Sequence, residues 1–200
     1  MANVKSKNGQ ISEIITCGKD PVYFMNKYLK IQHPLKGLIR FNTFPFQDDC
    51  VKDFNDHRFN IILKSRQLGL STLVAAYAVW QAVFYKEKNI LIIATKLAVA
   101  QNFIRKVKTY IKSMPKWLLV PVITANNKQQ VEFSNGSQIK AVPTSEDAGR
   151  SEALSLLIVD EAAFVRNFDE LWMGLYPTLS TGGRAILLST PNGVGGQYHE

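Results

Sequence analysis

The sequence predicts an α/β fold in which a mainly parallel central sheet is flanked by helices. Four short apolar runs have the composition of buried strands, and they lie at residues 59–63, 89–95, 154–164 and 184–193. Helical segments follow the first two runs, and this alternation is typical of parallel sheets covered by helices. Three of the runs end in polar residues, and in such sheets ligands sit at the carboxyl ends of the strands. The sequence therefore predicts a ligand site at one edge of the sheet.

The first strand, FNIIL, is β-branched and leads through a loop into a long apolar helix over residues 72–87. The second strand, NILIIAT, leads into a segment at residues 98–114 that places its apolar side chains at helical spacing and its basic side chains on another face. Those apolar positions are Val99, Phe103, Val107, Tyr110 and Ile111. This segment is therefore predicted to be an amphipathic helix packed on the sheet.

Residues 129–142 consist of two alternating runs around Asn135-Gly136, which is a strong signal for a tight hairpin turn. Residues 1–45 are expected to be a helical or irregular lead-in, because they combine short apolar patches with the turn formers Pro21, Pro34 and Pro45. The core is expected over residues 46–200, with a truncated C-terminus.

The composition is that of an ordinary globular protein, with 46% hydrophobic and 20% charged residues in a chain of 200. No apolar run approaches the roughly 18 residues of a membrane span, and the N-terminus has no secretory signal. Cys17 and Cys50 lack metal-ligand spacing and are expected to be reduced thiols. We therefore expect no membrane partner.

The net charge of +8 is unevenly distributed. No acidic residue lies between Glu87 and Glu132, whereas that interval holds Lys88, Lys96, Arg105, Lys106, Lys108, Lys112, Lys116 and Lys128. A basic field of this kind favours polyanions, above all nucleic acid. A solvated helix face is the alternative interpretation.

The loop after the first strand, KSRQLGLST, resembles a phosphate-binding loop that lacks its usual lysine. It comprises Lys64, Ser65, Arg66, Gln67, Leu68, Gly69, Leu70, Ser71 and Thr72. Leu70 stands where the lysine is expected, but Lys64 or Arg66 could supply the charge from the start of the loop. Ser71 has the spacing of the hydroxyl that holds Mg²⁺, and the following helix N-terminus favours anions. The alternative is a simple strand-to-helix turn.

Polar residues also follow the third and fourth strands. Asp160 and Glu161 are adjacent carboxylates at a strand end, where one can hold Mg²⁺ and the other can polarise an attacking water. Ser189, Thr190 and Asn192 follow the last strand and can sense a terminal phosphate beside the same crevice, although Pro-Asn-Gly is also an ordinary turn.

Taken together, these motifs resemble the ATPase domain of the large terminase subunit of tailed bacteriophages, especially that of myovirus-type phages. The resemblance runs from about residue 40 to the end of the sequence. It implies an additional-strand, RecA-like P-loop NTPase fold that hydrolyses ATP with Mg²⁺ and translocates double-stranded DNA into the procapsid. It also implies a homo-oligomeric ring on the portal protein, a small terminase subunit as partner, and a location in the host cytoplasm with a transient stay on the procapsid.

The resemblance assigns roles to individual residues. Residues 64–72 match the phosphate loop (Walker A), with Lys64 at a displaced lysine position and Arg66 as the runner-up. In the Walker B position, Asp160 matches the metal-holding carboxylate and Glu161 the catalytic one. The segment from Ser189 to Gly193 resembles the motif that couples hydrolysis to movement.

Two further roles rest on shorter matches. Gln47, after Phe46, resembles the glutamine that recognises adenine, with a surface glutamine as the alternative. Arg150 lies eleven residues before Glu161, where some terminases carry an arginine finger for a neighbouring subunit; an ordinary loop arginine is the alternative.

Leu70 and the end of the sequence depart from the family pattern. Family members continue into a metal-dependent nuclease domain, whose acidic cluster has no counterpart here, so no nuclease activity is expected.

Two alternative functions stay open. A helicase-like ATPase would fit the DEAA sequence at residues 160–163, although STPNG replaces the motif expected there. A docking module that does not bind nucleotide would fit Leu70.

Overall fold

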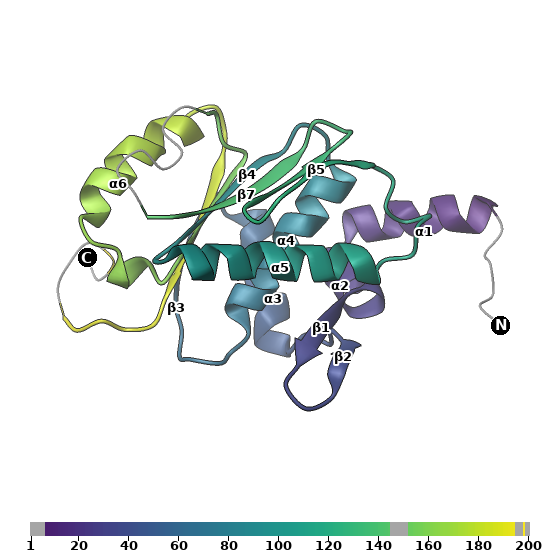
Figure 1. The fold of residues 1–200 in the computed structure, drawn as a ribbon, viewed down its shortest axis with the longest axis horizontal. Coiled ribbons are helices and arrows are strands. Elements are labelled where there is room, and N and C mark those ends of the chain that lie inside the picture. Colours follow the sequence, from purple (N-terminus) through teal and green to yellow (C-terminus); the bar gives the residue numbers. More distant parts are fainter. Residues whose placement is uncertain (1–6, 145–151, 195–197, 199–200) are drawn as a thin grey trace.

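The computed structural model describes residues 7–144, 152–194 and 198. Its centre is a seven-stranded sheet with the order β3-β9-β8-β4-β7-β6-β5 (Figure 1). The strands are β3 (Phe59–Leu63), β4 (Asn89–Ala94), β5 (Ile123–Asn126), β6 (Gln130–Phe133), β7 (Gln138–Pro143), β8 (Leu156–Asp160) and β9 (Arg184–Ser189).

Strands β3, β9, β8, β4 and β7 are parallel to one another, whereas β6 is antiparallel to both β7 and β5. The prediction of a mainly parallel sheet is confirmed. So is the hairpin, because β6 and β7 are joined by a turn in which Gly136 has a φ of +80°. Strand β9 lies between β3 and β8, so the last strand of the chain brings two distant loops together at one edge.

Helices cover both faces of the sheet. Helices α4 (Leu70–Phe84) and α5 (Leu97–Ser113) pack on one face, where Ile90 and Ile92 of β4 join the same core. Helix α6 (Phe168–Leu175) covers the other face together with Leu91 and Ile93, which alternate with those residues. The two 3-10 turns η1 (Ala162–Phe164) and η2 (Tyr176–Leu179) flank α6. The result is an α/β/α sandwich, as the continuous apolar strand sequences predict.

The first part of the chain packs on the same core as α4. It contains α1 (Lys7–Lys19), α2 (Pro21–Tyr28), the antiparallel strands β1 (Lys30–His33) and β2 (Gly37–Arg40), and α3 (Pro45–Asp56). Trp80 of α4 donates its indole N–H to the carbonyl of Cys17 at 2.8 Å, and the rings of Phe24 and Phe84 are 5.1 Å apart. The hairpin β1–β2 differs from the helical or irregular lead-in that the sequence predicts. Its strands have no fully buried residue, so they lack a strong apolar pattern.

Helix α4 is apolar on all sides because it is enclosed by α5, the sheet and the N-terminal helices. It begins at Gly69, whose φ of +73° is readily available only to glycine. Within the described residues, every helix is too short or too polar to cross a bilayer.

Candidate functional site

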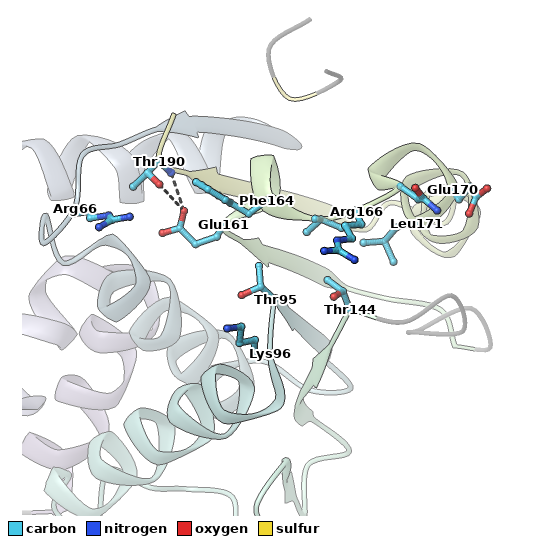
Figure 2. A pocket seen from close by; sticks show the side chains of 12 residues that line it. Arg66, Thr95, Lys96, Thr144, Glu161, Phe164, Arg166, Glu170, Leu171 and Thr190 are labelled. Atoms are coloured by element: carbon cyan, nitrogen blue, oxygen red, sulfur yellow. Dashed lines mark hydrogen bonds between the residues drawn. The ribbon is translucent and has the colours of Figure 1, made fainter. Parts of the chain in front are cut away.

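The carboxyl ends of the parallel strands surround a cavity of about 760 Å³. Figure 2 shows Arg66 after β3, Glu161 after β8 and Thr190 after β9 around this cavity, with Thr95 after β4 and Thr144 after β7. The predicted convergence of polar strand ends at one edge is thereby confirmed. The cavity is also lined by Lys96 and Arg166, which the sequence analysis does not single out as site residues.

The loop after β3 makes a tight turn. Gln67 and Gly69 both have positive φ angles, of 65° and 73°, which turns the chain sharply into the N-terminus of α4. A Cβ atom at Gly69 would lie 2.9 Å from Nε2 of Gln47, so a larger residue would also displace the side chain that holds the loop at Leu68. Ser65, Arg66 and the side chains up to Leu68 are exposed, so this turn faces solvent.

Gln47 supports this loop from α3. Its side chain is buried, its Nε2 donates to the carbonyl of Leu68 at 2.8 Å, and its Oε1 accepts from the backbone N–H of Phe44 at 3.1 Å. It is therefore not a surface glutamine, which was one of its two interpretations. Phe46 beside it is exposed and stacks on Phe44 with 5.8 Å between the ring centroids.

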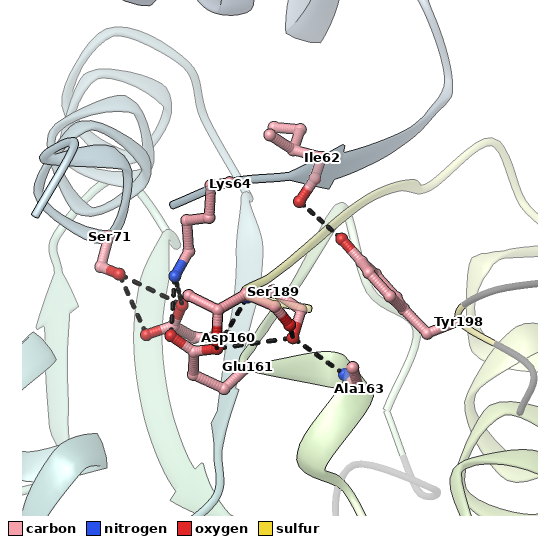
Figure 3. Close-up of polar contacts among 9 residues, drawn as sticks. Ile62, Lys64, Ser71, Asp160, Glu161, Ala163, Ser189 and Tyr198 are labelled. Atoms are coloured by element: carbon pink, nitrogen blue, oxygen red, sulfur yellow. Dashed lines mark hydrogen bonds and ion pairs between the residues drawn. The ribbon is translucent and has the colours of Figure 1, made fainter. Parts of the chain in front are cut away.

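Lys64 connects the loop to both carboxylates. Its side chain is buried, and Nζ lies 2.7 Å from Oε1 of Glu161 and 3.9 Å from Oδ1 of Asp160 (Figure 3). The backbone N–H of Lys64 donates to the carbonyl of Ser189 at 2.9 Å, which fixes the position from which the side chain extends. One ammonium group therefore faces two acids at the centre of the site.

Ser71 and Asp160 form a pair beneath the loop. The Ser71 hydroxyl is 3.1 Å from both carboxylate oxygens of Asp160. Burial raises the pKa of Asp160, against the opposing effects of Lys64 and of the Ser71 hydrogen bond. Hydroxyl and carboxylate oxygens are the donors that Mg²⁺ prefers, and two protein donors suffice where phosphates and waters complete the shell. Within the described ranges there is no cluster of three or more His, Cys, Asp or Glu side chains that would hold a metal alone.

Glu161 is turned away from Asp160 by its own backbone, which has a φ of 55° and a ψ of 47°. Its Oε2 accepts from the backbone N–H of Thr190 at 2.9 Å and from the Thr190 hydroxyl at 3.0 Å. Burial acts to raise the pKa of Glu161, but the hydrogen bonds from Lys64 and Thr190 outweigh it and hold that pKa below its usual value. Glu161 is therefore ionised at neutral pH.

The segment after β9 contacts the segment after β8. The Ser189 hydroxyl accepts from the backbone N–H of Ala163 at 3.1 Å, and Asn192 Nδ2 donates to the Ala163 carbonyl at 2.8 Å. Ser189, Thr190 and Asn192 thus all bond to Glu161 or to the turn that follows it. A displacement of either strand end would therefore alter its hydrogen bonds to the other.

Not every residue singled out in the sequence joins this network. Leu70 is buried in the apolar core, and Thr72 is half-buried, with its carbonyl accepting from Tyr110. Arg66 lines the cavity but forms no ion pair in the part of the chain that the structure describes. Arg150 lies outside the described residues.

Lys106 of α5 also faces this region, although the sequence gives no local signal for it. It lines a second groove together with Ser71 and Asp160. Burial lowers the pKa of Lys106, while the charge of Asp160 acts in the opposite direction.

Solved structures with a similar fold include terminases and a helicase. The large terminase of bacteriophage HK97 superposes with a TM-score of 0.67 at 18% identity, covering 86% of this chain and 37% of that one. The large terminase ATPase domain of Thermus phage P74-26 gives 0.59 at 20% identity, covering 69% and 61%. The UvsW helicase of bacteriophage T4 gives 0.57 at 16% identity, covering 86% and 59%. At these identities the likeness shows the fold, and the chain spans less than two thirds of each of these proteins.

A family match of the sequence favours the terminases over the helicase. Residues 61–199 match the family described as Terminase large subunit, T4likevirus-type, N-terminal. This stretch begins in β3 and includes the loop, both carboxylates and the segment after β9. Because the match covers more than half of the sequence, the chain belongs to the T4likevirus-type family of terminase large subunits.

Proposed function

We propose that this chain is the ATP-hydrolysing part of a phage DNA-packaging motor, which uses Mg-ATP to translocate double-stranded DNA into a procapsid. The observation that carries the proposal is the network at the sheet edge, where Lys64, Ser71, Asp160 and Glu161 converge beside the turn into the N-terminus of α4. Membership of the terminase family and the likeness to a terminase ATPase domain support it.

The nucleotide phosphates would bind at residues 65–70, because the N-terminus of α4 directs its N–H groups and the positive end of its dipole there. Lys64 would neutralise phosphate oxygens from the start of the loop, as the displaced lysine. Gln47 holds the loop at Leu68 in this structure, and Phe46 offers an exposed ring on which an adenine could stack. Gln47 would read the base edge by exchanging its present backbone partners for it.

Ser71 and Asp160 would hold Mg²⁺, since their three oxygens already lie within 3.1 Å of one another and match its preference for oxygen ligands. Bound Mg²⁺ would bridge phosphate oxygens and neutralise charge that develops on them. Asp160 is positioned for this by the Ser71 hydroxyl, at the end of the buried strand β8.

Glu161 would orient and polarise the attacking water. It is ionised at neutral pH and lies on the cavity side of the network, where a water can reach it. In the present arrangement both of its oxygens are occupied, by Lys64 on one side and Thr190 on the other. Binding of phosphates would draw Lys64 away and free one oxygen. Thr190 and Asn192 would then transmit the change to the chain after β9.

Activity on DNA belongs to a larger assembly than this chain. We propose that it acts in a homo-oligomeric ring on the portal protein, with the small terminase subunit as partner, in the host cytoplasm and transiently on the procapsid. Arg150 of a neighbouring copy would supply the arginine finger.

The likeness to a T4 helicase favours a second candidate, a helicase-like DNA-dependent ATPase. Such an enzyme would unwind a duplex, whereas a packaging motor would move along an intact duplex.

Mg-ATP binding and turnover test the proposal. We expect the parent chain to bind a fluorescent ATP analogue, and Lys64→Ala to weaken binding at least tenfold, about 1.4 kcal/mol. We expect Glu161→Gln to retain binding but to hydrolyse ATP at least about 100-fold more slowly, because it lacks the general base. Lys19→Ala, an exposed lysine on α1, is the control. Absence of nucleotide binding by a folded parent chain would overturn the ATPase function and leave the docking module.

A further inference from the structure

The positive charge available to the phosphates is small in this loop. Leu70 occupies the usual lysine position and is 4% exposed, inside the apolar core. Lys64 is its replacement, but this one ammonium group already faces Asp160 and Glu161 within 4 Å. A nucleotide would bring several further negative charges to the same point. Arg66, the other cation of the loop, is exposed and lines the cavity at the strand ends, which Ser71 and Asp160 do not line. A second cation beside Ser71 and Asp160 would therefore strengthen phosphate binding.

A groove of about 540 Å³ opens beside the Ser71–Asp160 pair. One wall consists of Ser71 and Thr72 of α4 with Asp160 of β8, and the other is formed by α5, including Lys106. The groove therefore gives α5 access to the position at which Mg²⁺ and the phosphates are proposed to sit.

Lys106 is half-buried beside the groove and has a charge that an anionic ligand could neutralise. Its Nζ lies 5.2 Å from the ring centroid of Phe103, within the range of a cation–π contact. Both Asp160 and Lys64 are close enough to act on its charge. Nevertheless, within the described residues Lys106 has no carboxylate within ion-pair distance. A partly desolvated ammonium group without its own acid is stabilised when an anion enters.

The other lysines of α5 do not face the groove in this way. Lys108 donates to the carbonyl of Asn127 at 2.7 Å, on the side toward β6. Lys112 lies in the last turn of the helix and is exposed. Arg105 is the other basic residue of α5 on this groove, but its side chain is exposed, whereas that of Lys106 is half-buried.

On the premise of the proposed function, we propose that Lys106 is a second cation for the phosphates of the bound nucleotide and takes over part of the role of the lysine missing at Leu70. Together Lys64 and Lys106 balance Asp160 and Glu161, so the empty set of four side chains carries no net charge.

Affinity for Mg-ATP and for adenosine, measured by calorimetric titration, tests this role. Lys106→Met keeps an unbranched side chain and removes the charge, and Lys19→Met, at an exposed lysine of α1, is the control. We expect Lys106→Met to bind Mg-ATP at least tenfold more weakly than the parent, with adenosine binding changed less than twofold. Lys19→Met should bind both ligands like the parent, and Lys106→Arg should restore most of the Mg-ATP affinity.

The outcomes separate this role from the proposed function. If the parent binds Mg-ATP and folded Lys106→Met binds it within twofold of the parent, the role of Lys106 is overturned and the ATPase function stands. An equal loss for Mg-ATP and adenosine would also overturn it, because the effect would then not concern the phosphates. If the folded parent does not bind Mg-ATP, both proposals fail. Lys106→Gln is the second variant, to be used with the same criteria if circular dichroism shows that the Met variant does not fold.

Discussion

Asp160 and Glu161 are neighbours in sequence, yet their environments move their pKa values in opposite directions. Asp160 is the last residue of a fully buried strand, and burial raises its pKa. Glu161 adopts a left-handed backbone that turns its side chain toward Lys64 and Thr190, and these donors lower its pKa despite its partial burial. A pair of carboxylates that titrate differently suits a division of labour between metal binding and water activation.

The first prediction concerns the cost of keeping Asp160 ionised. A carboxyl whose folded pKa is raised binds its proton more tightly in the folded state, so its ionised form lowers the free energy of unfolding above the unfolded-state pKa. We expect Asp160→Asn to raise the free energy of unfolding by about 1 kcal/mol at neutral pH and to abolish Mg-ATP binding. The gain should shrink as the pH falls toward the ordinary aspartate pKa of 3.8.

Glu161→Gln is the control, because its expected change in the free energy of unfolding has the opposite sign. A depressed pKa means that the ionised form stabilises the folded state above the unfolded-state pKa, so this substitution should lower the free energy of unfolding at neutral pH. Thermal unfolding at about pH 4 and about pH 7 measures both variants. An Asp160→Asn protein less stable than the parent at neutral pH would show that Asp160 is held mainly by Lys64 and Ser71.

At the residue scale, sequence motifs found the residues that follow strands and missed those that reach the site from other elements. Lys64, Asp160 and Glu161 carried a local signal, a polar residue after an apolar run. Arg166 and Lys106 carry none, because their positions depend on how α5 and the segment after η1 pack against the sheet. Lys96 is the second residue after β4 and lies at the same edge, although no motif marks it.

Strand β9 is the element on which the site depends most, because it is inserted between β3 and β8. Its first residue, Arg184, donates to the carbonyls of Phe54, Asn55 and His57, which ties the strand to the end of α3. The turn before it passes close to the chain that precedes β8. A Cβ atom at Gly183 would lie 2.2 Å from the carbonyl oxygen of Leu154 and 3.1 Å from Cα of Leu179.

The second prediction follows from this close approach. Gly183→Ala should lower the free energy of unfolding by about 2–3 kcal/mol, because the nearest atoms belong to the backbone and cannot move aside cheaply. Gly18→Ala is the control: its Cβ atom would make an ordinary contact of 3.5 Å with Phe84, and alanine favours the helix. Urea unfolding measures both. Equal stabilities would mean that the turn before β9 shifts freely.

At the element scale, length and apolar pattern decided what the sequence could predict. The long helices α4 and α5, the buried strands and the Asn-Gly hairpin were all predicted, since each carries many concordant signals. Helices α3 and α6 and strands β1, β2 and β5 were not. The three strands have four residues each and none that is fully buried, so tertiary packing fixes their structure and local pattern does not.

At the scale of the whole molecule, the order of the strands could not be read from the sequence. The apolar runs of β4, β8 and β9 are all rich in Ile, Leu and Val, and nothing in their composition decides which runs pair. The placement of β9 between β3 and β8 follows the additional-strand fold that the family resemblance implied. It is this order that brings Thr190 to Glu161, twenty-nine residues away in sequence.

The net charge of +8 is also a property of the whole molecule, and it leads to the last prediction. Arg105 and Lys112 lie on the solvent-facing side of α5, and Lys116 follows the helix; all three are exposed. None of them forms an ion pair within the ranges that the structure describes. Such a row can neutralise phosphates of a duplex without reading its sequence.

We expect the logarithm of the affinity for duplex DNA to fall linearly with the logarithm of the salt concentration. Replacing Arg105, Lys112 and Lys116 together by alanine should reduce the steepness of that line by up to about 2.7, since each phosphate contact contributes about 0.9. The matched control replaces Lys19, Lys36 and Lys52, three exposed lysines outside the basic interval, and removes the same charge. A reduction confined to the α5 variant would assign this face to DNA, because overall charge falls equally in both proteins. An equal reduction in both would attribute the effect to net charge, and a flat salt dependence in the parent would remove these residues from the DNA interface.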